Sequence, residues 1–323
     1  MSWAPQSQTW PGNQAVLFIH GVGDAAPGSY DDLLLEFDKA VGPTSSTVAK
    51  YVLYYDDIND WMKDKVNLAA QLKALIALLK AEASNATNDA ALGAAIAEFA
   101  GDVIMPVLNE APRVMVRDRI LSQLLQIRLD GASSGTPFPR QKISIICHSM
   151  GCFHTYEALH AAATNPAFKL RPLSENMQFR SVIFMASPVN LIRTGASKLG
   201  NIVPQRGLAT VSNQGLFNPF EIDPISGTQK NSALNLVSIV GELDPVGGYF
   251  FKDQVPWAYM SMSGQISILD KQSLLNINSK SELTDILWDL AVNGKASPNA
   301  LRNPHAWDAY IRNHGSEIAG WIA

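Results

Sequence analysis

The stretch Lys142 to Gly151 reads KISIICHSMG and decides the fold class of the chain. Ile143 to Cys147 is a short apolar run of the kind that forms a central strand of a sheet covered on both faces. A helical pattern that begins FHTYEAL follows Gly151. A serine on a sharp turn between a strand and a helix is the setting in which a serine acts as a nucleophile. The stretch therefore predicts that Ser149 is a catalytic nucleophile.

The neighbours of Ser149 agree with this prediction in part. A sharp turn lifts the hydroxyl clear of the sheet and aims the next amide, that of Met150, at an oxyanion. Small residues two positions before and after the serine let strand and helix pass closely. Gly151 fits this requirement, whereas Cys147 stands where a glycine is usual. The alternative is a serine that only caps the helix.

Other apolar runs of the chain predict further strands. They are Ala15 to Ile19, Tyr51 to Tyr55, Val182 to Ala186, Leu234 to Val240 and, more weakly, Gln265 to Leu269. Helical patterns cover Tyr30 to Val41, Arg113 to Leu129 and Met150 to Ala163. This alternation predicts an α/β fold with a mostly parallel central sheet, helices on both faces and a site at the carboxyl ends of the strands.

Two segments interrupt the alternation and predict insertions in a single domain that spans residues 1–323. The first, at about 60–109, is rich in Ala and Leu and predicts two helices, Asp60 to Ala83 and Asn88 to Val107. The second, at about 190–231, is rich in Gly, Asn, Pro and Ser and predicts irregular structure. The apolar stripe of the first helix predicts either a cap over an acyl chain or an ordinary core contact.

Three motifs in this order resemble the α/β hydrolase superfamily. They are HGVGD at His20 to Asp24, CHSMG at Cys147 to Gly151, and GELDPV at Gly241 to Val246. The resemblance implies an α/β hydrolase fold and a catalytic triad in the chain order serine, acid, histidine. It also implies that the amide of Val22, in the loop after the first strand, joins that of Met150 in the oxyanion hole. The alternative for this loop is an ordinary glycine turn.

Asp244 is the expected acid of the triad. It follows the apolar run LNLVSIV directly, so the end of a strand would project it toward the serine. Glu242 is its nearest rival, while Asp223 and Asp270 lack a convincing strand before them. A simple turn role before Pro245 is the alternative, because Asp-Pro is common in turns.

His305 is the expected base. Only His305 and His314 follow Asp244 in the chain. His305 lies in NPHAWDAYIRN, a loop before the terminal helix, and resembles the late histidine loop of the superfamily. His314 falls inside the helical pattern, where a solvated or capping role is expected.

Composition bounds the class of protein. The chain has 323 residues, of which 47% are hydrophobic and 17% charged, a balance typical of a globular protein. A net charge of -4 provides no basic surface for nucleic acid. No apolar run is long enough for a membrane helix and no secretory signal is seen, so a cytoplasmic location is expected. Cys147 and Cys152 are five residues apart, which predicts reduced core thiols.

The expected activity is hydrolysis of a small-molecule carboxylic ester through an acyl-enzyme, with neither a metal nor an organic cofactor. The preference for esters comes from the resemblance and is an analogy. A thioesterase or amidase would use the same triad. A noncatalytic binding protein on the same fold is the alternative from a different class.

Overall fold

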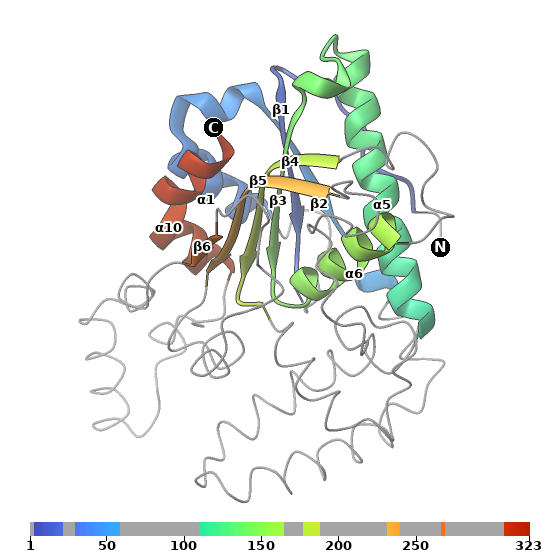
Figure 1. Cartoon of the computed structure of the whole chain (residues 1–323). Coiled ribbons are helices and arrows are strands. Elements are labelled where there is room, and N and C mark those ends of the chain that lie inside the picture. The colour runs from blue at the N-terminus through green and yellow to red at the C-terminus, as the bar shows by residue number, and fades with distance from the viewer. Residues whose placement is uncertain are drawn as a thin grey trace, which may run out of the picture.

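In the computed structural model (Figure 1), the described residues are 3–21, 30–58, 110–164, 177–187, 231–239, 266–268 and 307–323. They form one α/β unit. Both expected insertions, at about 60–109 and 190–231, fall almost entirely outside these ranges, as does the proposed cap.

Six strands form one sheet in the order β2-β1-β3-β4-β5-β6, and every neighbouring pair is parallel. The strands are β1 (Gln14–Ile19), β2 (Val48–Leu53), β3 (Lys142–His148), β4 (Met177–Met185), β5 (Asn231–Ile239) and β6 (Ile266–Ile268). The sequence prediction of a parallel sheet is thereby confirmed for the described part of the chain.

The strand boundaries depart from the apolar runs at several ends. β4 and β5 begin five and three residues earlier than their apolar runs, because backbone pairing continues through polar residues that propensity does not mark. The strand predicted at Tyr51 to Tyr55 was misplaced. β2 runs from Val48 to Leu53, so Tyr54 and Tyr55 belong to the turn that follows it.

Helices cover both faces of the sheet (Figure 1). The helix α1 (Asp31–Val41) packs beside α10 (Trp307–Ile322) on one face, and α5 (Glu110–Ser133) packs beside α6 (Met150–Thr164) on the other. Two short 3-10 helices, η1 (Gly42–Thr47) and η2 (Phe138–Arg140), precede β2 and β3. Alternate residues of β1 divide between the two cores: Leu17 and Ile19 face α5 and α6, while Val16 and Phe18 face α1 and α10.

The direction of connection in the sheet changes between β1 and β3, and we refer to the position outside the carboxyl ends of these two strands as the crevice. The chain leaves β1 toward β2 on one side, whereas it leaves β3 toward β4 on the other. Ligands of open parallel sheets bind outside the carboxyl ends of the strands where the direction of connection changes in this way. The residues that follow Ile19 and His148 therefore border the position at which the topology favours a site.

A buried carboxylate on α5, that of Asp130, binds the N-terminal segment of the chain. Asp130 on α5 accepts hydrogen bonds from Ser7 Oγ at 2.7 Å, the Gln8 amide at 2.9 Å and the Tyr51 hydroxyl at 2.8 Å. The Trp10 indole N–H in turn donates to the Tyr51 hydroxyl at 2.9 Å. The contacts of Asp130 with Ser7 and Gln8 join segments more than 100 residues apart in the sequence.

Candidate active site

Ser149 lies on a tight turn between β3 and α6, as the sequence predicts. Its φ is 53°, a left-handed value that costs a non-glycine residue about 1 to 2 kcal/mol. The Ser149 amide donates to the carbonyl of Met185 at 2.9 Å, and the Ser149 carbonyl accepts from the Cys152 amide at 2.9 Å. The turn is therefore held on both sides. Strain maintained by its surroundings is a feature of functional positions.

Ala186 provides a comparison within the same sheet. It follows β4 as Ser149 follows β3, has the same φ of 53°, and donates its amide to the Ile239 carbonyl at 2.9 Å. Among the described residues these two are the non-glycine positions with positive φ. Ala186 carries a methyl group where Ser149 carries a hydroxyl, so the turn geometry alone does not supply chemistry.

Gly151 explains how α6 can begin so close to the sheet. A Cβ at this position would lie 2.3 Å from the His20 carbonyl oxygen and 2.4 Å from that of Ile19. The first turn of the helix thus packs directly on the carboxyl end of β1. This contact brings the amides at the start of α6, including that of Met150, beside the crevice, where the helix dipole favours negative charge.

Gly21 borders the crevice on the β1 side and contacts Ser149. A Cβ on Gly21 would lie 2.5 Å from Ser149 Cβ, 3.1 Å from Ser149 Oγ and 3.2 Å from His148 Nδ1. The backbone after β1 therefore touches the serine side chain, and only glycine allows this approach. Ser149 itself is buried, with 1% of its surface exposed.

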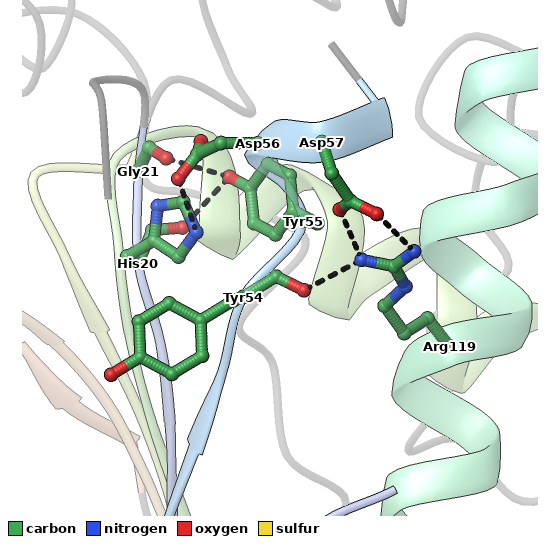
Figure 2. Close-up of polar contacts among 7 residues, drawn as sticks. All are labelled: His20, Gly21, Tyr54, Tyr55, Asp56, Asp57 and Arg119. Atoms are coloured by element: carbon green, nitrogen blue, oxygen red, sulfur yellow. Dashed lines mark hydrogen bonds and ion pairs between the residues drawn. The ribbon is translucent and has the colours of Figure 1, made fainter. Parts of the chain in front are cut away.

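Tyr55 supports this glycine from behind (Figure 2). Its hydroxyl lies 2.8 Å from the His20 carbonyl oxygen and 2.8 Å from that of Gly21. The Tyr55 ring is stacked on the His20 imidazole with centroids 4.2 Å apart and planes inclined by 11°. The edge of the His154 ring completes the enclosure at 5.1 Å.

A buried guanidinium holds the turn that carries Tyr55. Arg119 on α5 donates to the Tyr54 carbonyl at 2.9 Å and to the Asp57 carboxylate, with one of these bonds at 3.0 Å (Figure 2). Arg119 is buried, so its charge is balanced mainly by this carboxylate. The residues on either side of Tyr55 are thereby fixed to a long helix.

Two of the buried histidines are poor proton acceptors. Burial lowers the pKa of His20 to about 3, against a smaller raising effect of its hydrogen bond with the Gly21 backbone. Burial also lowers the pKa of His154 to about 3, and nearby His20 and Arg113 act in the same direction. The contact of 3.5 Å between His20 Nε2 and Asp56 Oδ2 is therefore one between a carboxylate and a neutral imidazole at pH 7. Neither ring is suited to deprotonate a serine.

His148, which immediately precedes Ser149, contacts the terminal helix. Its imidazole is stacked on the Trp307 indole, with centroids 5.7 Å apart and planes inclined by 12°, and the Tyr310 ring lies 5.9 Å away. α10 then runs away from the site, because its last turn reaches Ser181, whose hydroxyl donates to the Trp321 carbonyl. The first turn of α10 is thus beside His148, the residue before Ser149.

The predicted site residues fall into two groups. Ser149 and Met150 are described and lie where the motif requires. Val22, Asp244 and His305 lie outside the described residues, as do the rivals Glu242, Asp223 and Asp270. The structure describes a near neighbour of each predicted residue: Gly21 precedes Val22, Ile239 precedes Asp244 by five positions, and Trp307 follows His305 by two.

The expectation for His314 was wrong. Its position within α10 is as predicted, but the side chain is 2% exposed and neither ring nitrogen has a hydrogen-bond partner. Burial accordingly lowers the pKa of His314. The helix pattern could not reveal this, because α10 packs against α1 along the face that carries His314 and Gly315, whose Cβ would lie 2.3 Å from that of Ala40. The two cysteines are buried and form no disulfide, as expected.

The supporting residues of the crevice were missed by sequence reasoning. Tyr54 to Asp57 reads YYDD directly after β2, the strand next to β1. Four polar or aromatic residues at the carboxyl end of a strand are a signal that could have been used. This signal was missed because Tyr55 was assigned to the strand instead of to the segment that follows it.

No family model, curated protein or solved structure matches this chain. Within the described ranges, no cluster of side chains has the composition of a metal site. In the same part of the chain, no helix combines the length and apolarity needed to span a bilayer.

Proposed function

We propose that the chain is a serine hydrolase of the α/β hydrolase type that cleaves a carboxylic ester, with Ser149 as its nucleophile. One observation carries the proposal: a serine in the left-handed conformation lies between β3 and α6, at the crevice, in contact with Gly21 at the start of the loop that follows β1. The strand-turn-helix setting, the helix start and the contact with Gly21 are the parts that acyl transfer to a serine requires.

The position of Trp307 supports His305 as the base. Two residues span at most about 7 Å of chain, so His305 lies within that range of a residue whose ring is stacked on His148. His148 is in turn adjacent to Ser149. His314, by contrast, is seven residues beyond Trp307 along a helix that rises about 1.5 Å per residue away from the site, and its side chain is buried.

The end of β5 supports Asp244 as the acid. Ile239 accepts a hydrogen bond from Ala186, so the ends of β4 and β5 lie level with the nucleophile turn. β5 is two strands from β3, about 10 Å away at the usual strand spacing. Five residues can span about 17 Å, which is enough to bring Asp244 toward a histidine beside Ser149.

In the proposed reaction, His305 takes the proton of Ser149 Oγ as that oxygen attacks the acyl carbon. The amides of Met150 and Val22 bind the oxyanion. The tetrahedral intermediate breaks its bond to the alcohol, which leaves with the proton from His305. Water, deprotonated by the same histidine, then attacks the acyl-enzyme, and the second tetrahedral intermediate releases the acid as His305 returns the proton to Ser149 Oγ. Asp244 stabilises the imidazolium in both steps.

Labelling with a fluorophosphonate probe tests the proposal most directly. We expect one adduct on Ser149 by mass spectrometry, and hydrolysis of a p-nitrophenyl ester that is lost in Ser149→Ala. A folded protein that neither labels nor hydrolyses esters, thioesters or amides would favour the noncatalytic binding protein. Activity confined to thioesters or amides would keep the triad and replace the substrate class.

A further inference from the structure

We propose that Tyr55 is a positioning residue that holds the backbone of the His20–Gly21 loop in the orientation needed to bind an oxyanion at Ser149. This inference rests on the proposed function and deepens it. Tyr55 does not itself touch the reacting atoms in this scheme. It acts through the two peptide units whose carbonyl groups it holds.

The hydroxyl of Tyr55 is placed to fix both carbonyls together. Its distances to the oxygens of His20 and Gly21 are equal, at 2.8 Å. Tyr55 is 1% exposed, so bulk water does not provide a substitute donor if the hydroxyl is removed. A buried carbonyl without a hydrogen bond costs free energy, so the peptide unit is expected to rotate until the carbonyl reaches another donor.

Fixing a carbonyl also fixes an N–H. Because a peptide unit is planar and trans, its N–H points opposite to its C=O. The His20 carbonyl shares its peptide unit with the Gly21 N–H, and the Gly21 carbonyl shares its unit with the N–H that follows. The Gly21 N–H is therefore directed away from the Tyr55 hydroxyl.

Ser149 lies at the same loop. Gly21 touches Ser149 through its α-carbon, as the 2.5 Å distance from a built Cβ to Ser149 Cβ shows. The loop is thus enclosed between the tyrosine hydroxyl and the serine turn. An oxyanion hole needs donors that are already oriented before charge develops, and a glycine loop has too much freedom to provide this unaided.

The environment of Tyr55 fixes the hydroxyl in turn. Its ring is enclosed between the His20 and His154 rings, and Arg119 binds the residues on both sides through the Tyr54 carbonyl and the Asp57 carboxylate. Figure 2 shows this chain of contacts from α5 to Gly21. The His20–Gly21 loop is therefore connected to α5 through Tyr55 and the Arg119 contacts.

Tyr55→Phe tests the inference, and Tyr51→Phe is its matched control. Both variants remove one buried hydroxyl from tyrosines four residues apart in and after β2. The Tyr51 hydroxyl binds Asp130 and Trp10, away from the crevice. We expect Tyr55→Phe to lower kcat for a p-nitrophenyl ester about 10-fold to 100-fold with little change in KM, somewhat less than loss of a donor itself. We expect Tyr51→Phe to lower Tm and leave kcat unchanged.

A boronic acid that forms a tetrahedral adduct with Ser149 provides a second measurement. If Tyr55 had only a structural role, the inhibition constant of this compound would not change in Tyr55→Phe. Its inhibition constant should rise in Tyr55→Phe by about the same factor as kcat falls. Equal kcat and equal inhibition in wild type and Tyr55→Phe would overturn the inference alone. An inactive, unlabelled wild type would overturn the proposed function and the inference with it.

Arg119→Lys serves as a second variant if Tyr55→Phe does not fold. A lysine cannot reproduce the paired contacts of the guanidinium with Tyr54 and Asp57. We expect kcat to fall about threefold or more at unchanged KM, because the turn carrying Tyr55 loses its anchor. An unchanged kcat in a folded Arg119→Lys protein would contradict the inference.

Discussion

The indole ring of Trp307 is stacked on the imidazole ring of His148, at 5.7 Å between centroids and 12° between planes. His148 immediately precedes the proposed nucleophile, and Trp307 is two residues beyond the proposed base. One ring contact therefore connects the two chain segments between which a proton must pass. It also fixes where the terminal helix begins.

Trp307→Ala should reduce kcat/KM by more than the fraction of protein that the substitution unfolds. Loss of the stack releases the start of α10, and small displacements of a catalytic group cost large factors in rate. We expect kcat/KM to fall at least 10-fold, whereas Trp307→Phe retains a stacking ring and most of the activity. Trp321→Ala is the control, because Trp321 packs on the same core at the other end of α10. Equal losses of activity in the two alanine variants would contradict this reading.

Ser149→Ala and Ser149→Gly should both be inactive but should differ in stability. A left-handed φ is strained for alanine and permitted for glycine, so we expect Ser149→Gly to be more stable by roughly 1 kcal/mol. Urea unfolding of the two variants measures the difference. A more stable alanine variant would show that the turn relaxes when the hydroxyl is removed.

The acid and base assignments predict a specific pair of sensitive residues. Asp244→Asn and His305→Ala should each lower kcat by several orders of magnitude, while Glu242→Gln should not. The control for the base is His314→Leu, which replaces two buried unpaired nitrogens with an apolar side chain and should keep both activity and stability. Loss of activity in Glu242→Gln and His314→Leu, with the first pair active, would reverse the assignment.

Gly21→Ala should inactivate the protein. A Cβ there would meet Ser149 at 2.5 Å, so either the loop or the nucleophile turn must move. Gly320→Ala is the matched control: no atom lies within 4 Å of its built Cβ, and alanine favours the helix by about 0.5 to 1 kcal/mol. We expect this control to keep full activity with an equal or higher Tm. An active Gly21→Ala variant would show that the contact with Ser149 is dispensable.

The buried histidines predict destabilisation in mild acid. His20 and His154 have pKa values of about 3 when folded and ordinary values of 6.5 when unfolded, so between these pH values the unfolded chain binds more protons. The free energy of unfolding should therefore fall as pH drops from 6.5 toward 3, by up to about 1.4 kcal/mol per pH unit for each group. Urea titrations at pH 7 and pH 5 measure this slope. His154→Phe should flatten it, and an unchanged slope would mean that His154 is not buried in its neutral form.

Local patterns in the sequence were sufficient for the parallel sheet and for the position of Ser149 on the turn between β3 and α6. A buried parallel strand is apolar over most of its length, so the apolar run of β3 could be predicted from the sequence. Ser149 follows this strand with no intervening residue. Tyr55 and His148 were not readable in the same way. Their roles depend on contacts with His20 and Trp307, which reach them from other strands and helices, and single-sequence patterns carry no information about such pairing.

His314 also shows that a local pattern can predict an element correctly without predicting the burial of its side chains. Its helix was predicted correctly, but its burial depends on α1, a partner more than 250 residues away in the chain. Polar side chains are ordinarily exposed, so composition alone assigned it to solvent. Burial of an unpaired imidazole is a property of the assembled layers rather than of the helix.

The interior position of β1, between β2 and β3, has a consequence for folding during synthesis. β1 pairs on one side with β2, but its partner on the other side, β3, begins only at Lys142, and Asp130, which binds Ser7 and Gln8, also comes late. Until residue 148 has left the ribosome, one edge of an apolar strand has no native partner. Such long-range pairing is slow and exposes aggregation-prone surface. The nascent N-terminal part of this chain should therefore depend on chaperones more than its finished fold would suggest.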